Sequence, residues 1–176
     1  ALEKSHFGGL KTNRDYLIAI LRSEEFLKGN TTTDFLNQAN IKDEINLTKE
    51  EVLLTAISAS MWVQGKNRND SEVLSNLASG WNNARLPNQE VNFDYSGEKI
   101  SIKYKRNRDN TFSISDGKKV IIHSWAPNFI DVEIDNSRLR SKITYEKDLI
   151  LINTKSGDVL FKICLLYTSP SPRDLV

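Results

Sequence analysis

The first third of the chain alternates short apolar stripes with polar turns, a pattern typical of short amphipathic helices. Thr12 and Asp15 stand three positions apart, the spacing at which a hydroxyl and a carboxylate cap the start of a helix. Apolar residues then recur at helical spacing up to position 21, and Gly29 closes the next short stretch. The pattern predicts helices over 13–23 and 24–28, and a further turn after the capping pair Thr31 and Asp34.

A longer apolar stretch follows the strongest start signal in the chain. Thr48 and Glu51 form a capping box directly before it. Between positions 52 and 63, apolar residues surround the helix axis and leave almost no polar stripe, until Gly65 and a polar run stop the pattern. We therefore expect a helix that begins at Lys49, covers about 16 residues or roughly 24 Å, and is buried on every side.

The periodicity changes to two after position 90. Val91, Phe93 and Tyr95 alternate with Asn92 and Asp94, as expected for a half-buried strand. Similar segments follow, and turn residues such as Ser-Gly, Asp-Gly and Asp-Asn separate them. The eight predicted strands cover 91–95, 100–105, 112–114, 120–125, 129–134, 139–145, 149–152 and 159–163.

Eight short, evenly spaced strands favour a closed barrel over an open sheet, because closure removes exposed edges. The sequence thus predicts an α+β fold: short N-terminal helices, then a long apolar helix surrounded by an eight-stranded antiparallel β-barrel. Such a barrel is narrow inside, so we expect it to be flattened, sheared or incompletely closed. A sandwich with the helix packed outside is the alternative.

Composition narrows the classes of function. Lys and Arg number 24 against 23 Asp and Glu, and a net charge of +1 attracts neither nucleic acid nor an anionic membrane. There is no run of about 20 apolar residues and no secretory signal, so a cytoplasmic protein is expected, or a mitochondrial matrix protein in a eukaryote. A single Cys excludes an internal disulfide and a cysteine-based zinc site. The only Met is Met61, which indicates a fragment.

Motifs of catalysis are missing from the sequence. It contains no dinucleotide fingerprint, no Walker loop and no nucleophile elbow. His6 and His123 lie far apart, and neither has a second ligand at metal-binding spacing. We interpret His123 as structural, since a general base needs an orienting carboxylate that the sequence does not locate. No catalytic, cofactor-binding or metal-binding residue is predicted.

We interpret two basic runs as solvent-exposed faces of strands. Their side chains fall on the face opposite the apolar positions of the strands, where a solvated surface is expected. Nearby aromatic residues leave nucleic-acid binding as a competing reading of the first run. The runs comprise Lys103, Lys105, Arg106 and Arg108, and then Arg138, Arg140 and Lys142.

Trp81, Arg85 and Leu86 lie in an irregular segment between the long helix and the strands. Trp and Arg in loops are typical of protein interfaces, so we predict that these residues contact a partner. The alternative is that Trp81 folds back and plugs the mouth of the barrel.

Two stretches resemble a known family, the biotin-bearing subunit of acyl-CoA carboxylases of the propionyl-CoA and 3-methylcrotonyl-CoA type. The segment from Gly8 to Asn13, with the residues that follow up to Phe35, is similar to the end of a biotin carboxylase domain. The order of long helix, Gly80-Trp81-Asn82, Leu86-Pro87, eight strands and Ser124-Trp125-Ala126-Pro127 resembles the domain that links this enzyme to its carboxyltransferase. The resemblance covers about residues 1–163.

The resemblance implies a scaffold without an active site of its own. In such subunits ATP and bicarbonate carboxylate biotin, with Mg as a further cofactor, and the biotin then carries the carboxyl group to an acyl-CoA. The ATP-binding residues and the biotin-accepting lysine would both lie outside this chain, so no cofactor is expected here. The implied partners are the carboxyltransferase subunit and the biotin carboxylase domain, in a hetero-oligomer, with Trp81, Arg85 and Leu86 in a hook-like loop that contacts them.

The resulting division is 1–40 for the end of the biotin carboxylase domain, 41–163 for the linking domain and 164–176 for a tail. Cys164 to Asp174 resembles a translated sequencing adapter, although a Pro/Ser-rich linker has a similar composition. A small-ligand-binding barrel of the lipocalin type remains the alternative function, because it also has eight strands. An independent nucleic-acid-binding barrel is a third.

Overall fold

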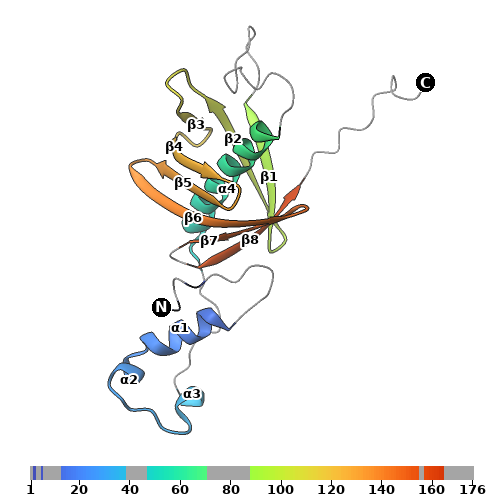
Figure 1. Cartoon of the computed structure of the whole chain (residues 1–176). Coiled ribbons are helices and arrows are strands. Elements are labelled where there is room, and N and C mark those ends of the chain that lie inside the picture. Colours follow the sequence, from blue (N-terminus) through green and yellow to red (C-terminus); the bar gives the residue numbers. More distant parts are fainter. Residues whose placement is uncertain are drawn as a thin grey trace, which may run out of the picture.

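Short helices form near the N-terminus, as predicted. The computed structural model of the chain describes residues 2, 5, 13–38, 47–70, 88–154 and 157–164. Within them, α1 spans Arg14–Arg22, α2 spans Glu24–Leu27 and α3 spans Phe35–Gln38 (Figure 1). Ser23 caps α2, because its hydroxyl accepts a hydrogen bond from the Phe26 amide at 3.4 Å. The predicted cap at Thr12 lies outside the described residues.

The long helix α4, Lys49–Asn69, begins where the capping box predicts. The Glu51 amide donates to Thr48 Oγ1 at 3.2 Å, and the Thr48 amide donates to Glu51 Oε2 at 2.8 Å. The prediction for its end was wrong: the helix continues through Gly65 and has 21 residues rather than about 16. Gly65 is helical rather than a terminator, and its role is steric, as described below.

The buried surface of α4 is also more polar than predicted. Besides its apolar residues it buries Thr55, Ser58, Ser60 and Gln64. The hydroxyls of Thr55 and Ser60 donate to carbonyls of the preceding turn, to Glu51 at 2.7 Å and to Ala56 at 2.9 Å. Such bonds satisfy a hydroxyl within its own helix, so these small residues can be buried without a partner from a strand.

All eight predicted strands are present in the described part of the chain, each within three residues of its expected limits. Several hairpin loops have two residues, and both loop residues have positive φ at Ser96-Gly97 and Asp135-Asn136. This conformation suits a tight hairpin and favours Gly, Asn and Asp. The strands are β1 Gln89–Tyr95, β2 Glu98–Arg106, β3 Phe112–Ile114, β4 Lys119–Ala126, β5 Phe129–Ile134, β6 Ser137–Glu146, β7 Leu149–Asn153 and β8 Asp158–Cys164.

The strands form a closed antiparallel barrel in sequence order, which confirms the predicted barrel and excludes one of its three expected forms, the incompletely closed one. Closure depends on β1 and β8, which pair over only three positions, Phe93 with Ile163 and one pair on each side. One of these flanking pairs joins Asn92 to Cys164, so β8 extends to the first residue of the predicted tail. Alternate strand residues such as Ile102, Val132, Ile152 and Phe161 point into the core.

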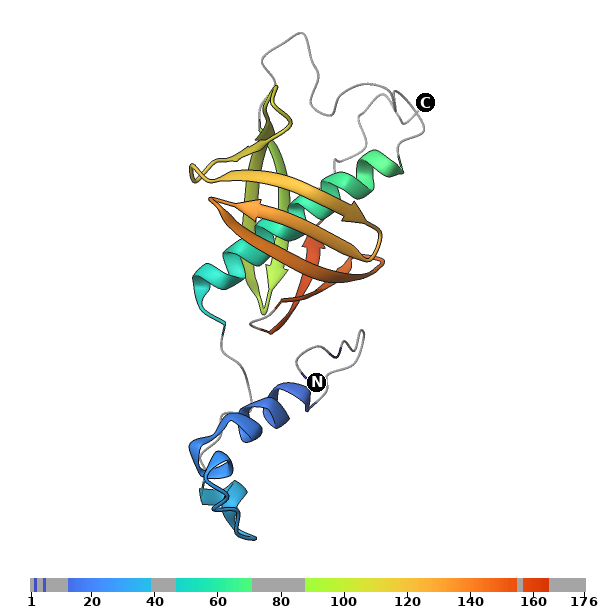
Figure 2. The same ribbon diagram turned by 60° about the vertical axis from the view of Figure 1, so that its left-hand side comes forward.

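The core joins α4 to the inner face of the strands. Ala56, Ile57 and Met61 are fully buried and belong to one cluster with the inward residues of the barrel. α4 contacts β2, β4, β5, β7 and β8, which lie in both halves of the ring. In Figure 2, α4 passes behind the orange strands β4, β5 and β6. Within the described ranges, no helix is both long and apolar enough to cross a membrane.

One charged contact ties the N-terminal helices to the barrel. The Arg14 guanidinium, at the start of α1, is almost fully buried and lies 2.9 Å from Asp158 at the start of β8. The same side chain contacts Asp15 and donates to the Ser5 carbonyl at 2.9 Å. Several apolar residues of these helices remain exposed, namely Leu17, Leu21, Phe26, Leu27 and Leu36.

Candidate interaction surface

Two tryptophans hold the C-terminal half of α4 against the β4–β5 hairpin. The Trp62 indole donates to the Ala126 carbonyl at 3.0 Å, and the Trp125 indole donates to the Trp62 carbonyl at 3.1 Å. The two rings stack with centroids 6.4 Å apart. A Cβ at Gly65 would lie within 3.0 Å of three atoms of the Trp125 indole, so only glycine fits here. We call Trp62, Gly65 and Trp125 the tryptophan clasp.

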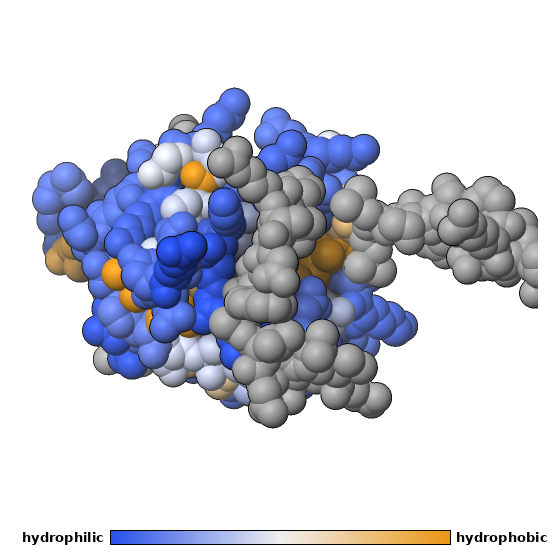
Figure 3. All heavy atoms as spheres, turned by 90° about the horizontal axis from the view of Figure 1, so that it is seen from above, coloured by the Kyte–Doolittle hydropathy of each residue, from blue (hydrophilic) through white to orange (hydrophobic). Residues whose placement is uncertain are grey.

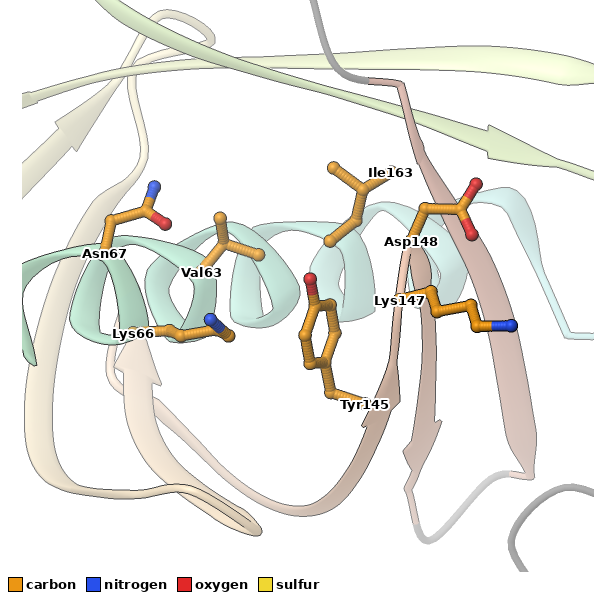
Figure 4. A pocket seen from close by; sticks show the side chains of 7 residues that line it. All are labelled: Val63, Lys66, Asn67, Tyr145, Lys147, Asp148 and Ile163. Carbon is orange, nitrogen blue, oxygen red and sulfur yellow. The ribbon is translucent and has the colours of Figure 1, made fainter. Parts of the chain in front are cut away.

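A small pocket lies beside the clasp, because Tyr145, one of its lining residues, packs against Trp62 with ring centroids 5.3 Å apart. Figure 4 shows the side chains that line it. Its volume is about 100 Å³. Lys66 lies with its ammonium 5.1 Å from the centre of the Tyr145 ring and 2.5 Å from an oxygen of Asp70. The hydrogen bond that Lys66 donates to Asp70 raises the pKa of Lys66, and the same bond lowers the pKa of Asp70. The lining residues are Val63, Lys66, Asn67, Tyr145, Lys147, Asp148 and Ile163.

The three predicted interface residues, Trp81, Arg85 and Leu86, lie outside the described residues, so their contacts stay a prediction. The segment that contains them joins the end of α4 to the start of β1. Figure 3 views the molecule from above, and its described surface on that face is mostly hydrophilic, with apolar residues in small separate areas.

His123 occupies a position that the sequence did not predict. The register between β4 and β5 shifts between Ile122 and Ser124, so His123 is the extra residue of a β-bulge. Its ring is partly exposed, and Nε2 lies 2.8 Å from an oxygen of Glu133 on the neighbouring strand. The carboxylate that a histidine base needs is therefore present. Among the described residues no nucleophile bonds to this pair, so the geometry supports a hydrogen bond that links the two strands.

A buried carboxylate on the outer face of the barrel was missed by sequence reasoning. Asp131 occupies an outward position of β5, yet no part of it is exposed. Arg138 donates to both of its oxygens at 2.8 Å, and Arg140 donates a third bond at 2.8 Å. These hydrogen bonds lower the pKa of Asp131 to about 2, and the bonding to Arg138 is the largest cause. Desolvation of the buried carboxylate acts in the opposite direction. The two arginines cover the carboxylate and exclude water from it.

The alternation predicted for the first basic run is confirmed. Lys103 and Lys105 point outward and are exposed, while Tyr104 between them is buried. Lys103 lies 3.6 Å from Glu90, and Arg106 donates to the side chain of Asn110 at 2.6 Å. These acidic and amide partners make the surface mixed rather than continuously basic, which weakens the nucleic-acid reading.

The chemistry of the described part is limited. Its His, Cys, Asp and Glu side chains form no group of three or more that could hold a metal ion. In comparison with known protein families and with curated proteins, no match to this chain is found. The functional interpretation therefore depends on three structural features: the filled core, the tryptophan clasp and Asp131 under its two arginines.

Proposed function

We propose that this chain is a non-catalytic scaffold, a piece of a biotin-dependent acyl-CoA carboxylase subunit that holds biotin carboxylase and carboxyltransferase in one assembly. The observation that carries the proposal is the packing of α4 against strands from both halves of an eight-stranded ring. The parent enzyme would use ATP, bicarbonate, Mg and biotin, and this chain would supply the connection between its two catalytic parts.

In this proposal α4 occupies the interior of the barrel as an apolar core helix. An eight-stranded barrel is narrow inside, so small side chains on part of the helix surface let the strands approach the helix closely. Ala56, Ser58, Ala59 and Ser60 form such a stretch, and all four are buried. The helix ends carry the polar residues, which suits a helix that emerges at both mouths of the barrel.

Two observations on the described residues argue against the alternative of a ligand-binding barrel. Pockets for small molecules usually measure about 300–1,000 Å³. The pocket beside the clasp measures about 100 Å³ and lies between α4 and the β6–β7 hairpin rather than at the centre. Ile57 and Met61, which have no exposed surface, lie in the core cluster where a lipocalin-like protein would keep its cavity. A filled core suits a scaffold, whose task is to hold its partners in position.

The gene itself offers the first test. Sequencing the source DNA past the codon of Ile163 should lead into a biotinyl domain with its acceptor lysine. A stop codon, or an unrelated domain, in the genomic reading frame would contradict the proposal. Sequence upstream of Ala1 should encode an ATP-binding biotin carboxylase domain.

Assembly offers the second test. In the full-length subunit, Trp81→Ala or Arg85→Ala should weaken copurification with the carboxyltransferase subunit, because truncating a central Trp or Arg of an interface typically costs about 2 kcal/mol or more. Asn82→Ala, in the same segment, is the matched control. Unchanged assembly for both variants would reject the assigned loop, and absence of any wild-type complex would reject the scaffold.

A further inference from the structure

The outer face of β6 carries three cations in a row. Arg138, Arg140 and Lys142 occupy alternate positions, about 7 Å apart along the strand, and all three are exposed. We call them the basic row. Their neutralisation is uneven, since Arg138 donates two hydrogen bonds to Asp131 while Arg140 donates only its Nε–H. Within the described part of the chain, no partner is recorded for the terminal nitrogens of Arg140 or for the Lys142 ammonium.

Arg140 is held in place although its side chain is 67 % exposed. Its Nε bonds to a carboxylate that is itself immobilised under two arginines. Its guanidinium carbon lies 5.6 Å from the centre of the Phe129 ring, on the adjacent strand. A free arginine loses rotamer freedom when it binds, but this one has already lost that freedom on folding. Arginine and aromatic residues ordered in this way are typical of the residues that dominate interfaces.

The surrounding charges determine which partner fits. Asp131 has both oxygens occupied, and Glu133 is bonded to His123. The single charge of Asp131 is shared by two arginines, so Arg138, Arg140 and Lys142 keep an excess of positive charge. Among the described residues, the terminal nitrogens of Arg140 and the Lys142 ammonium contact no carboxylate, and Lys142 stands directly opposite Phe129 in the strand register. Two cations beside one aromatic ring match a carboxylate with an adjoining apolar side chain. A polyanion such as nucleic acid needs a longer basic track, and here Glu133 and Asp135 follow at one end of the row.

We propose that Arg140, Lys142 and Phe129 form a docking surface for an acidic segment of a protein. A side-chain carboxylate of that segment accepts hydrogen bonds from the terminal nitrogens of Arg140, while Lys142 supplies a second attractive charge. Asp131 and Arg138 are positioning residues that hold Arg140 in its binding conformation. This surface lies on the strands, away from Trp81 and Arg85 in the sequence, and the inference does not depend on the carboxylase proposal.

A titration of the ¹⁵N-labelled 176-residue chain with an acetylated hexaglutamate peptide tests the proposal. At low salt, the side-chain Nε–H signal of Arg140 should shift with saturation. Arg140→Gln should weaken binding by about tenfold, the loss expected for one charge-assisted hydrogen bond of about 1.5 kcal/mol. Lys99→Gln is the matched control, because it removes one exposed positive charge from β2, and it should change affinity by less than twofold.

The proposal is overturned if the Arg140 signal shows no saturable shift, or if the two variants lose equal affinity. Tighter binding of a single-stranded oligonucleotide at the same residues would also overturn it, since that result identifies a different class of partner. Near-ultraviolet circular dichroism checks that Arg140→Gln is folded. Arg140→Lys is the second variant, which keeps the charge but loses the planar fork, and it should weaken binding by an intermediate factor.

Discussion

Gly65→Ala tests whether the tryptophan clasp determines the residue at this position of α4. In an isolated helix this substitution would be favourable, because alanine has the higher helix propensity by about 1 kcal/mol. In this protein the new methyl group would lie within 3.0 Å of the Trp125 indole. That ring cannot move freely, since it stacks on Trp62 and donates to the Trp62 carbonyl. We therefore expect destabilisation.

The size of the effect follows from three contributions. Inserting a group into a packed core costs about 1–3 kcal/mol. A displaced Trp125 loses its hydrogen bond to Trp62, which costs about 1 kcal/mol. The higher helix propensity of alanine offsets about 1 kcal/mol of this loss. The net loss in the free energy of unfolding is then about 1–3 kcal/mol, which lowers the Tm by about 2–12 °C in a chain of this size.

Urea unfolding followed by far-ultraviolet circular dichroism measures this loss without relying on the tryptophans as probes. Asn67→Ala is the control, because Asn67 is exposed on the same helix and its replacement adds helix propensity without a collision. The control should leave the free energy of unfolding unchanged or raise it by a few tenths of a kcal/mol.

A double-mutant cycle isolates the steric cause. Trp125→Val removes the three indole atoms that the new methyl group would meet. In that background Gly65→Ala should cost nothing or stabilise the protein, so the two substitutions should couple strongly. If Gly65→Ala destabilises both backgrounds equally, the clasp is not the reason for glycine at position 65.

Two further predictions concern the cap of α4 and the buried carboxylate. Thr48→Ala should lower the free energy of unfolding by about 1 kcal/mol because it opens the capping box, whereas Thr48→Asp should restore most of it; equal urea midpoints for wild type and Thr48→Ala would contradict this. The pKa of Asp131 is about 2, well below its unfolded value near 4, so its ionised form contributes stability above pH 4, and that contribution is lost as the pH falls from about 4 to 2. Asp131→Asn should therefore flatten the fall in stability over this range, and Asp94→Asn is the half-buried control on β1; parallel pH profiles for wild type and Asp131→Asn would reject this role.

Local sequence signals predicted the elements of the fold well. The capping box at Thr48 and Glu51 depends on residues three positions apart, so it can be read without knowledge of the tertiary structure. The strands are equally predictable from sequence, because alternating apolar and polar residues indicate that one face of a strand is buried. Two-residue loops such as Asp135-Asn136 indicate where a hairpin turns. Barrel closure follows less directly, since the pairing of β1 with β8 joins residues about 70 positions apart.

Two positions that local signals do not explain share a long-range cause. Gly65 has the sequence signature of a helix terminator, but glycine is required there because Trp125, 60 positions later, occupies the space beside it. Asp131 looks exposed because it alternates with Ile130 and Val132, and only the arginines of the next strand bury it. A signal for Asp131 was present in the sequence, since Arg140 is its direct partner across a two-residue hairpin. The loop of Trp81 and Arg85 remains a prediction from composition and resemblance alone.

The pairing of the first strand with the last has a consequence for synthesis on the ribosome. Translation proceeds at about 5–20 residues per second, so several seconds pass between the synthesis of α4 and that of β8. During that interval no closed wall can cover Ile57, Met61 and Trp62, which are buried in the finished protein. A nascent chain that ends before Phe161 therefore exposes these apolar side chains to solvent, and a truncated chain of that length would be prone to aggregate.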